Sequence, residues 1–166
     1  MNLTIGFKGQ LKLNAQAVPL QEGYLKIGGI VNNSQTNGLS FGVVASVNPD
    51  DPDLFVAGTA SGNVVRGIVV FDDAIAQNAP AHPGKYLAGM PASVLNHGFA
   101  WLQNWTKTAT GAQDPALGCK VIFKDADGTI EFLPATAGSV PSGYTELTNV
   151  SVRGVDDNHG ALIYIN

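Results

Sequence analysis

The feature that most constrains the fold of this chain is a period of two in its apolar residues, interrupted by frequent turn residues. Leu3, Ile5 and Phe7 alternate with smaller or polar residues, and Phe41–Val47 repeats the pattern. Such alternation places apolar side chains on one face of a β-strand, whereas a helix needs a spacing of three to four. No long segment carries a clean helical stripe. The sequence therefore predicts an all-β protein.

Two segments sharpen this prediction. Val64–Phe71 is apolar on both faces apart from Arg66 and Gly67, which is typical of a central strand. The run KVIFKDADGTIEFL places Asp127 and Gly128 between two β-rich segments and predicts a tight hairpin. Further strands are expected at Leu54–Gly58, Ser93–Gln103, Lys120–Lys124, Thr129–Leu133, Thr148–Arg153 and Ala161–Ile165.

Many short strands separated by turn signals predict a β-sandwich or barrel, jelly-roll-like, in a single domain over residues 1–166. Residues 1–20 are expected to form an extended N-terminal arm. One short helix is expected at DDAIAQN, where Asp72 or Asp73 would cap it and Pro80 and Pro83 would stop it.

Charged residues are scarce. They make up 13% of the chain, and the net charge is −4. A nucleic-acid binder needs a basic patch, so nucleic acid is excluded as a partner. The surface must consist largely of neutral polar residues and glycine. Because such a surface has little charge repulsion, it favours association between copies.

The sequence carries no signal for disulfides, secretion or membrane insertion. Cys119 is the single cysteine and begins a β-rich run, where a buried inert thiol is expected. The N-terminus lacks a basic region followed by an apolar run. No apolar stretch approaches the ~18 residues that span a bilayer. We therefore expect synthesis in a cytoplasm and no membrane partner.

Candidate catalytic groups each have a structural explanation. Ser61 lies in the run GTASG, which lacks the glycine spacing of a nucleophile elbow and is expected to be a turn between strands. The pair Gly28 and Gly29 is not followed by the lysine and hydroxyl of a phosphate loop. Glu131 is expected in mid-strand near Lys124, where a cross-strand ion pair explains it.

Candidate metal ligands lack the required spacing. His82, His97 and His159 have no ligand partner nearby in the sequence, and a shared site would need two distant turns to meet. The turn that begins at Asp125 mimics half a calcium loop, but its glycine falls at the fourth rather than the sixth position. We expect no metal, no cofactor and no catalytic residues, so the chain is not predicted to be an enzyme.

Three aromatic residues lie at even spacing. Phe99, Trp101 and Trp105 have separations that place two or three of them on one face of a strand. If that face points inward, they belong to the core. If Trp105 is exposed, it is suited to anchor an interface, because tryptophan buries a large area at low entropic cost.

The stretch Gly67–Trp105 carries a family resemblance. A strand VRGIVVFD, a connector with IAQN and PGKYLAGMP, and a strand VLNHGFAW resemble the head-decoration, or structural cement, proteins of tailed bacteriophages. The flanking regions agree with that family in style, with a strand-forming N-terminal arm, Gly/Asn/Ala-rich loops and a hairpin near the C-terminus.

The resemblance implies a virion protein, made in the host cytoplasm, that binds the outer surface of an icosahedral capsid as a homodimer or homotrimer. It would staple neighbouring major capsid proteins together against internal DNA pressure. Candidate interface residues are Leu3, Ile5, Phe7, Trp101 and Trp105. The N-terminal strand suits addition to a partner's sheet edge, although the same alternation suits an ordinary edge strand equally well.

Two alternatives stay open. One is a β-sandwich carbohydrate- or receptor-binding module of a virion, in which Trp101 or Trp105 stacks on a sugar ring. The other is a hydrolase with a non-standard site.

Overall fold

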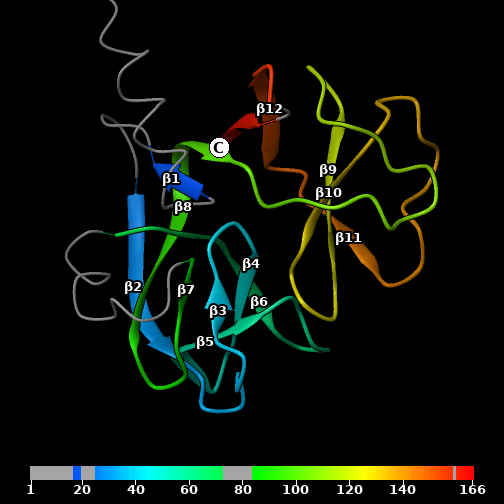
Figure 1. The fold of residues 1–166 in the computed structure, drawn as a ribbon. Helices are drawn as coiled ribbons and strands as arrows, with labels where there is room; N and C mark the ends of the chain where they lie inside the picture. Colours follow the sequence, from blue (N-terminus) through cyan, green and yellow to red (C-terminus); the bar gives the residue numbers. More distant parts are fainter. Residues whose placement is uncertain (1–16, 20–24, 73–83, 159) are drawn as a thin grey trace, which may run out of the picture.

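The computed structural model describes residues 17–19, 25–72, 84–158 and 160–166 (Figure 1). These residues form strands and no helix. The strands are β1 (Ala17–Pro19), β2 (Leu25–Val31), β3 (Leu39–Ser40), β4 (Val44–Asn48), β5 (Asp51–Ala57), β6 (Val64–Val70), β7 (Lys85–Tyr86), β8 (Pro91–Leu102), β9 (Lys120–Lys124), β10 (Ile130–Leu133), β11 (Tyr144–Glu146), β12 (Val150–Val155) and β13 (Ala161–Ile165).

Five strands close into a small barrel. Strand β8 pairs with β2 on one side and with β6 on the other, and β5 and β4 complete the ring. The β2–β5 pairing is parallel and the other four are antiparallel. Closure pairs both sides of each of these strands and so protects their edges. One apolar cluster draws on all five strands and on the small β3–β7 sheet; its buried members are Val31, Leu39, Phe41, Val43, Ala45, Val47, Phe55, Val69, Tyr86, Ala92 and Val94.

Strand β8 continues beyond the barrel. Its last residues pair with β13 on one side and with β1 on the other, and β12 pairs with the far side of β13. The same long strand therefore serves two sheets. Figure 1 shows β8 running from the barrel up to β1, with β12 beside its upper end.

A second core joins this extension to a three-stranded sheet of order β10-β9-β11. Residues from β6, β8 and β13 meet residues from β9 and β10 in one buried apolar cluster, which includes Ile68, Leu95, Ile163, Phe123 and Phe132. In Figure 1 the three-stranded sheet lies to the right of the barrel. Strand β6 has both faces covered by these two cores, as its apolar sequence predicts.

The all-β prediction is confirmed. Strands β9 and β13 have the predicted bounds, and the β9–β10 hairpin pairs Phe123 with Ile130 around the predicted turn. The predicted helix, DDAIAQN, lies outside the described residues apart from Asp72, and the predicted arm, residues 1–20, lies outside them apart from β1. In the described part of the chain, no helix has the length and apolar character needed to cross a membrane.

Candidate functional site: an aromatic sheet face and a polar pocket

The sheet extension carries a row of large apolar side chains on its outer face. Alternate residues of β8 and β13 point into the core, so the residues between them point the other way. These are Phe99 and Trp101 of β8 with Leu162 and Tyr164 of β13, all half-buried, and we call them the aromatic face. The register pairs Phe99 with Tyr164 and Trp101 with Leu162. The face is therefore continuous across two strands.

Ring contacts hold part of this face together. The Phe99 and Tyr164 ring centroids are 4.6 Å apart, and His97 meets Tyr164 edge-on at 5.8 Å. The exposed Arg153 guanidinium lies 5.6 Å from the Tyr164 ring centroid. Aromatic rings beside an arginine are the residue types that anchor protein–protein interfaces.

Strand β1 ties the N-terminal end of the chain to this face. Its residue Val18 pairs with Trp101, and Ala17 pairs with Leu102. The first described residue, Ala17, therefore lies beside the strand that carries Trp101. The candidate interface residues Leu3, Ile5 and Phe7 lie outside the described residues.

Trp105 occupies a different environment from Trp101. Strand β8 ends at Leu102, and Trp105 makes an isolated bridge with Ile130 of β10. Its ring packs edge-on against Phe132 at 5.8 Å and against the second core, with the Lys107 ammonium 6.0 Å from the ring centroid. The even spacing therefore groups Phe99 with Trp101 but not with Trp105.

A buried carboxylate organises the opposite face of the three-stranded sheet. Glu131 of β10 has no exposed surface. Its oxygens accept hydrogen bonds from the backbone N–H groups of Thr108 (2.8 Å) and Ala109 (2.7 Å). They also accept from the hydroxyls of Thr106 (2.8 Å), Thr108 and Tyr144 (3.3 Å). One side chain thus fastens the segment after Trp105 to the sheet.

This arrangement corrects the ion pair expected for Glu131. Its cross-strand neighbour is Ile122, and Lys124 pairs instead with Asp127 at 3.4 Å. Burial alone would raise the pKa of Glu131, but the hydrogen bonds from Thr108, Ala109 and Thr106 outweigh it and hold the pKa below its ordinary value. Glu131 acts as an ionised structural clamp.

The described candidate catalytic and metal-binding residues lie apart and do not form a common site. Ser61 is exposed in the turn between β5 and β6, and His97 lies on β8 beside Tyr164. His82 and His159 lie outside the described residues. Within the described ranges, no three His, Cys, Asp or Glu side chains form a group that could hold a metal ion.

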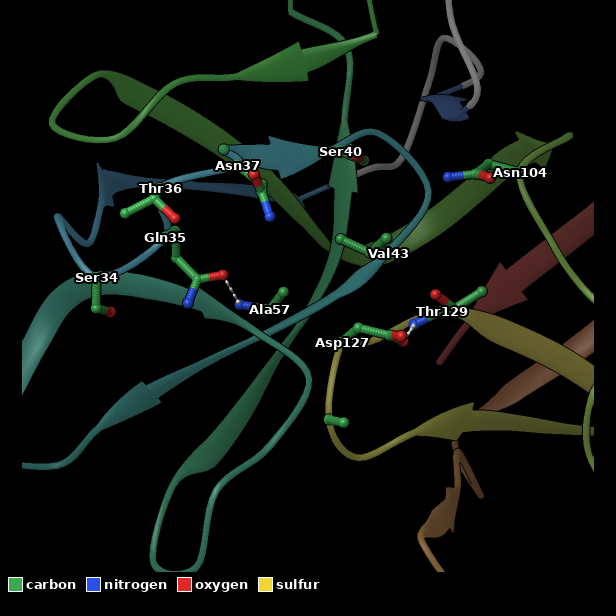
Figure 2. A pocket seen from close by; sticks show the side chains of 12 residues that line it. Ser34, Gln35, Thr36, Asn37, Ser40, Val43, Ala57, Asn104, Asp127 and Thr129 are labelled. Atoms are coloured by element: carbon green, nitrogen blue, oxygen red, sulfur yellow. Dashed lines mark hydrogen bonds between the residues drawn. The ribbon is translucent and has the colours of Figure 1, made fainter.

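A polar pocket of about 420 Å³ opens where the barrel meets the β9–β10 hairpin (Figure 2). One wall is the loop that joins β2 to β3, and the opposite wall is the hairpin turn. Neutral amides and hydroxyls dominate the lining, which consists of Ser34, Gln35, Thr36, Asn37, Gly38, Ser40, Val43, Ala57, Asn104, Ala126, Asp127 and Thr129. The sequence analysis missed this pocket, because its two walls are far apart in the chain and the only local signal is the amide-rich run NNSQTNG.

Hydrogen bonds fix several of these side chains. Gln35 Oε1 accepts from the Ala57 N–H at 3.3 Å, and Asn104 Nδ2 donates to the Phe41 carbonyl at 3.1 Å. Figure 2 shows Asn104 reaching toward the hollow from one side. Each of these hydrogen bonds fixes the orientation of the whole amide group. The other polar atom of each amide, Gln35 Nε2 or Asn104 Oδ1, is therefore also held in a defined direction.

Close backbone packing docks the hairpin wall on the barrel. The N–H of Val44 donates to Gly128 O at 2.8 Å, the N–H of Gly58 donates to Val44 O at 2.9 Å, and the N–H of Thr59 donates to Asp125 O at 2.8 Å. Gly128 has φ +73°, and a Cβ placed there would lie 2.3 Å from Val44 O. Only glycine fits this junction, so the pocket has a fixed shape.

Comparison with known proteins gives a family. The family model of the structural cement proteins matches residues 1–166. The description of this family names the proteins E217 gp24 and Pam3 gp6. A solved structure of the capsid of Myoviridae phage XM1 contains a chain with a TM-score of 0.64 and 18% identity, and the match covers 93% of this chain and 90% of that one. At this identity the likeness concerns the fold. No curated protein matches the chain. The resemblance seen in Gly67–Trp105 is confirmed over the whole sequence, and the chain belongs to the structural cement protein family of phage capsids.

Proposed function

We propose that this chain binds the major capsid protein on the outer surface of an icosahedral phage head and staples neighbouring copies together. It would be made in the host cytoplasm, add to the assembled shell and resist the pressure of the packaged DNA, without catalysing a reaction. The family match supports a structural role in the capsid. The observation that carries the contact itself is the aromatic face, a continuous apolar row on a surface otherwise poor in charge.

The proposed contact combines this face with the N-terminal residues. Trp101 is a half-buried aromatic residue of the kind that supplies interface hot spots. Leu3, Ile5 and Phe7 precede β1, and their alternation suits a strand that adds to the edge of a partner's sheet. Trp105 packs against Phe132, so we assign it to the fold rather than to the contact.

We further propose that residues 1–166 act as one domain with residues 1–20 as its arm, and that copies associate as a homodimer or homotrimer. Closed symmetric assemblies of this size match the symmetry positions of an icosahedral shell. The low charge of the chain, 13% of its residues, opposes association only weakly. Light scattering coupled to size-exclusion chromatography measures the mass directly; a monomer at micromolar concentration argues against association in solution.

Co-sedimentation with expanded capsids that lack the protein tests the proposed binding. Trp101→Ala should weaken binding about tenfold or more, the loss typical of an interface hot spot. Removal of residues 1–10 should weaken capsid attachment more than it lowers the melting temperature. Leu117→Ala serves as the control, because this side chain is 69% exposed and lies outside the aromatic face; it should bind as the unaltered protein does.

Two outcomes would contradict the proposal. The unaltered chain would fail to pellet with the capsids, or the truncated chain would lose melting temperature and binding in equal measure. The second result would place residues 1–10 in the core and remove them from the contact.

A further inference from the structure

The polar pocket at the barrel–hairpin junction has no part in the contact proposed above. Its lining shares no residue with the aromatic face. It is concave, and its volume of about 420 Å³ lies within the range of small-molecule sites. It is also built from two parts of the chain that a rigid junction holds in place.

The lining offers hydrogen-bond donors and acceptors in close alternation. Amides come from Gln35, Asn37 and Asn104, and hydroxyls from residues that include Ser40 and Thr129. In Figure 2 the side chains of Asn37 and Asn104 approach the hollow from two segments, the loop that joins β2 to β3 and the residues that follow β8. An amide presents a donor and an acceptor in one plane. This pattern fits neighbouring hydroxyls, each of which both donates and accepts.

The charge of the pocket narrows the ligand class. Among the described residues that line the pocket, Asp127 is the one charged residue, and none is lysine or arginine. Two ammonium groups lie beside the lining, but each already has an acceptor: Lys124 pairs with Asp127 at 3.4 Å, and Lys85 donates to the Asn37 carbonyl at 2.9 Å. Phosphate, sulfate and carboxylate ligands would therefore have to compete with these acceptors and would face the Asp127 carboxylate. Desolvation opposes ionisation of Asp127, but the hydrogen bond from the Thr129 N–H and the nearby Lys124 outweigh it and lower its pKa. The ionised oxygen is a strong acceptor for a hydroxyl.

The floor supplies the apolar part of a site. Val43 and Ala57 line the pocket between the polar walls. A sugar ring has C–H groups on its faces and hydroxyls around its rim, so an apolar floor with a polar rim matches it. We propose that this pocket binds a neutral sugar unit, with Asp127 and the amides of Asn37 and Asn104 as the hydroxyl-binding groups.

Titration of the ¹⁵N-labelled full-length protein by NMR tests the proposal. The probes are the methyl glycosides of glucose, galactose, mannose and N-acetylglucosamine, up to about 10 mM, which detects the weak binding expected of a small polar site. At least one sugar should shift the amide signals of residues 34–38, 104 and 126–129. Glycerol at the same concentration should not.

Two variants separate the pocket from a general surface effect. Asp127→Asn keeps an oxygen for the Thr129 N–H but removes the charge, so the sugar affinity should fall about tenfold, the value of one charge-assisted hydrogen bond. Asp114→Asn removes the same charge from an exposed site outside the pocket and should leave the affinity unchanged. Unaltered backbone spectra of both variants show that the fold is retained.

Four outcomes would overturn the proposal: no shift with any sugar, an equal response to glycerol, equal affinities of the two variants, or shifts centred on Trp101. The last result would place sugar binding on the aromatic face. If capsids instead cover the pocket and sugars do not compete with them, the pocket is a socket for a capsid loop and the proposal also fails. The four outcomes of the sugar titration leave the co-sedimentation result unchanged, so the two proposals are tested separately.

Discussion

The barrel and the three-stranded sheet are stabilised in different ways. In the barrel, five strands close on one another and bury an apolar interior whose largest fully buried side chains are Phe55 and Tyr86. The one polar group of that pair is satisfied, because the Tyr86 hydroxyl donates to the Val70 carbonyl at 2.8 Å. In the three-stranded sheet, one face joins the second core, and the other combines a small apolar cluster around Ile122 and Leu133 with the buried carboxylate of Glu131.

The difference shows where each part is vulnerable. The barrel spreads its stability over many contacts, and loss of one large side chain weakens the whole. The three-stranded sheet shares the second core with β6, β8 and β13, and it also has two local features: the clamp at Glu131 and the glycine junction at Gly128 that docks its hairpin on the barrel. Substitutions in the two regions should therefore differ in how far the destabilisation spreads as well as in the unfolding free energy that is lost.

The largest effect is expected from Phe55→Ala in the barrel. This side chain has no exposed surface, and its removal leaves a cavity that should cost about 3–5 kcal/mol of unfolding free energy. That loss corresponds to a fall of roughly 10 °C in Tm, measured by circular dichroism. Phe99→Ala on the half-buried aromatic face is the matched control and should cost less than half as much. Equal losses would mean that the barrel interior is not the main core.

A somewhat smaller effect is expected from Gly128→Ala at the junction. The added Cβ meets backbone atoms at 2.3 and 2.7 Å, in addition to the strain of φ +73°, so the cost should be about 3 kcal/mol. Gly143→Ala is the matched control, because Gly143 has φ +82° but open space around its Cβ. It should cost only about 1 kcal/mol. If denaturant unfolding gives the same cost for both, close packing of the hairpin on the barrel is not what requires glycine.

Glu131→Gln should release the clamp locally. An amide turns an NH₂ group toward backbone donors that the carboxylate now accepts from, so about 2–3 kcal/mol should be lost. Hydrogen exchange should accelerate at Thr108 and Ala109 while the barrel strands stay protected. Glu146→Gln, which weakens a partly exposed pair with Lys120 at 3.5 Å, should change little. If hydrogen exchange accelerated equally across the barrel strands, Glu131 would stabilise the whole fold rather than the segment around Thr108.

Low pH should reduce the stability of the protein through the same side chain, Glu131. The pKa of Glu131 in the fold lies below its ordinary value of about 4.5, so its contribution is complete above that pH and is lost as the pH falls through the folded-state pKa. The Tm difference between the unaltered protein and Glu131→Gln should therefore shrink as the pH is lowered below 4.5. Asp127, whose pKa is also lowered, is present in both proteins and cancels in the comparison. A difference that stays constant with pH would argue against an ionised Glu131.

Much of the fold was predictable from local pattern. Strand β6, both strands of the β9–β10 hairpin and β13 follow from apolar runs and turn chemistry within a few residues of one another. Strand β2 was missed because Gly28 and Gly29 interrupt its alternation. The structure explains the second glycine: a Cβ there would lie 2.7 Å from the Phe55 ring, so the residue permits close packing of β2 on β5.

The sites were less predictable, because each joins distant segments. Barrel closure depends on which strands meet, and periodicity does not encode partners. Glu131 looked like one half of a surface pair, since its partners Thr106, Thr108 and Ala109 lie more than twenty residues away in sequence, in a loop with no regular pattern. Phe99, Trp101 and Trp105 are evenly spaced in the sequence, but β8 ends at Leu102, so Trp105 does not share a strand face with the other two. Side-chain chemistry predicted the candidates, and tertiary contacts decided their roles.

A density map of the decorated particle by cryo-electron microscopy tests the central claim most directly. The account predicts density for this chain outside the shell, with Trp101 of the aromatic face and residues 1–16 against the major capsid protein. A particle that carries this chain on its inner surface, or attaches it only through the opposite side of the barrel, would contradict the account.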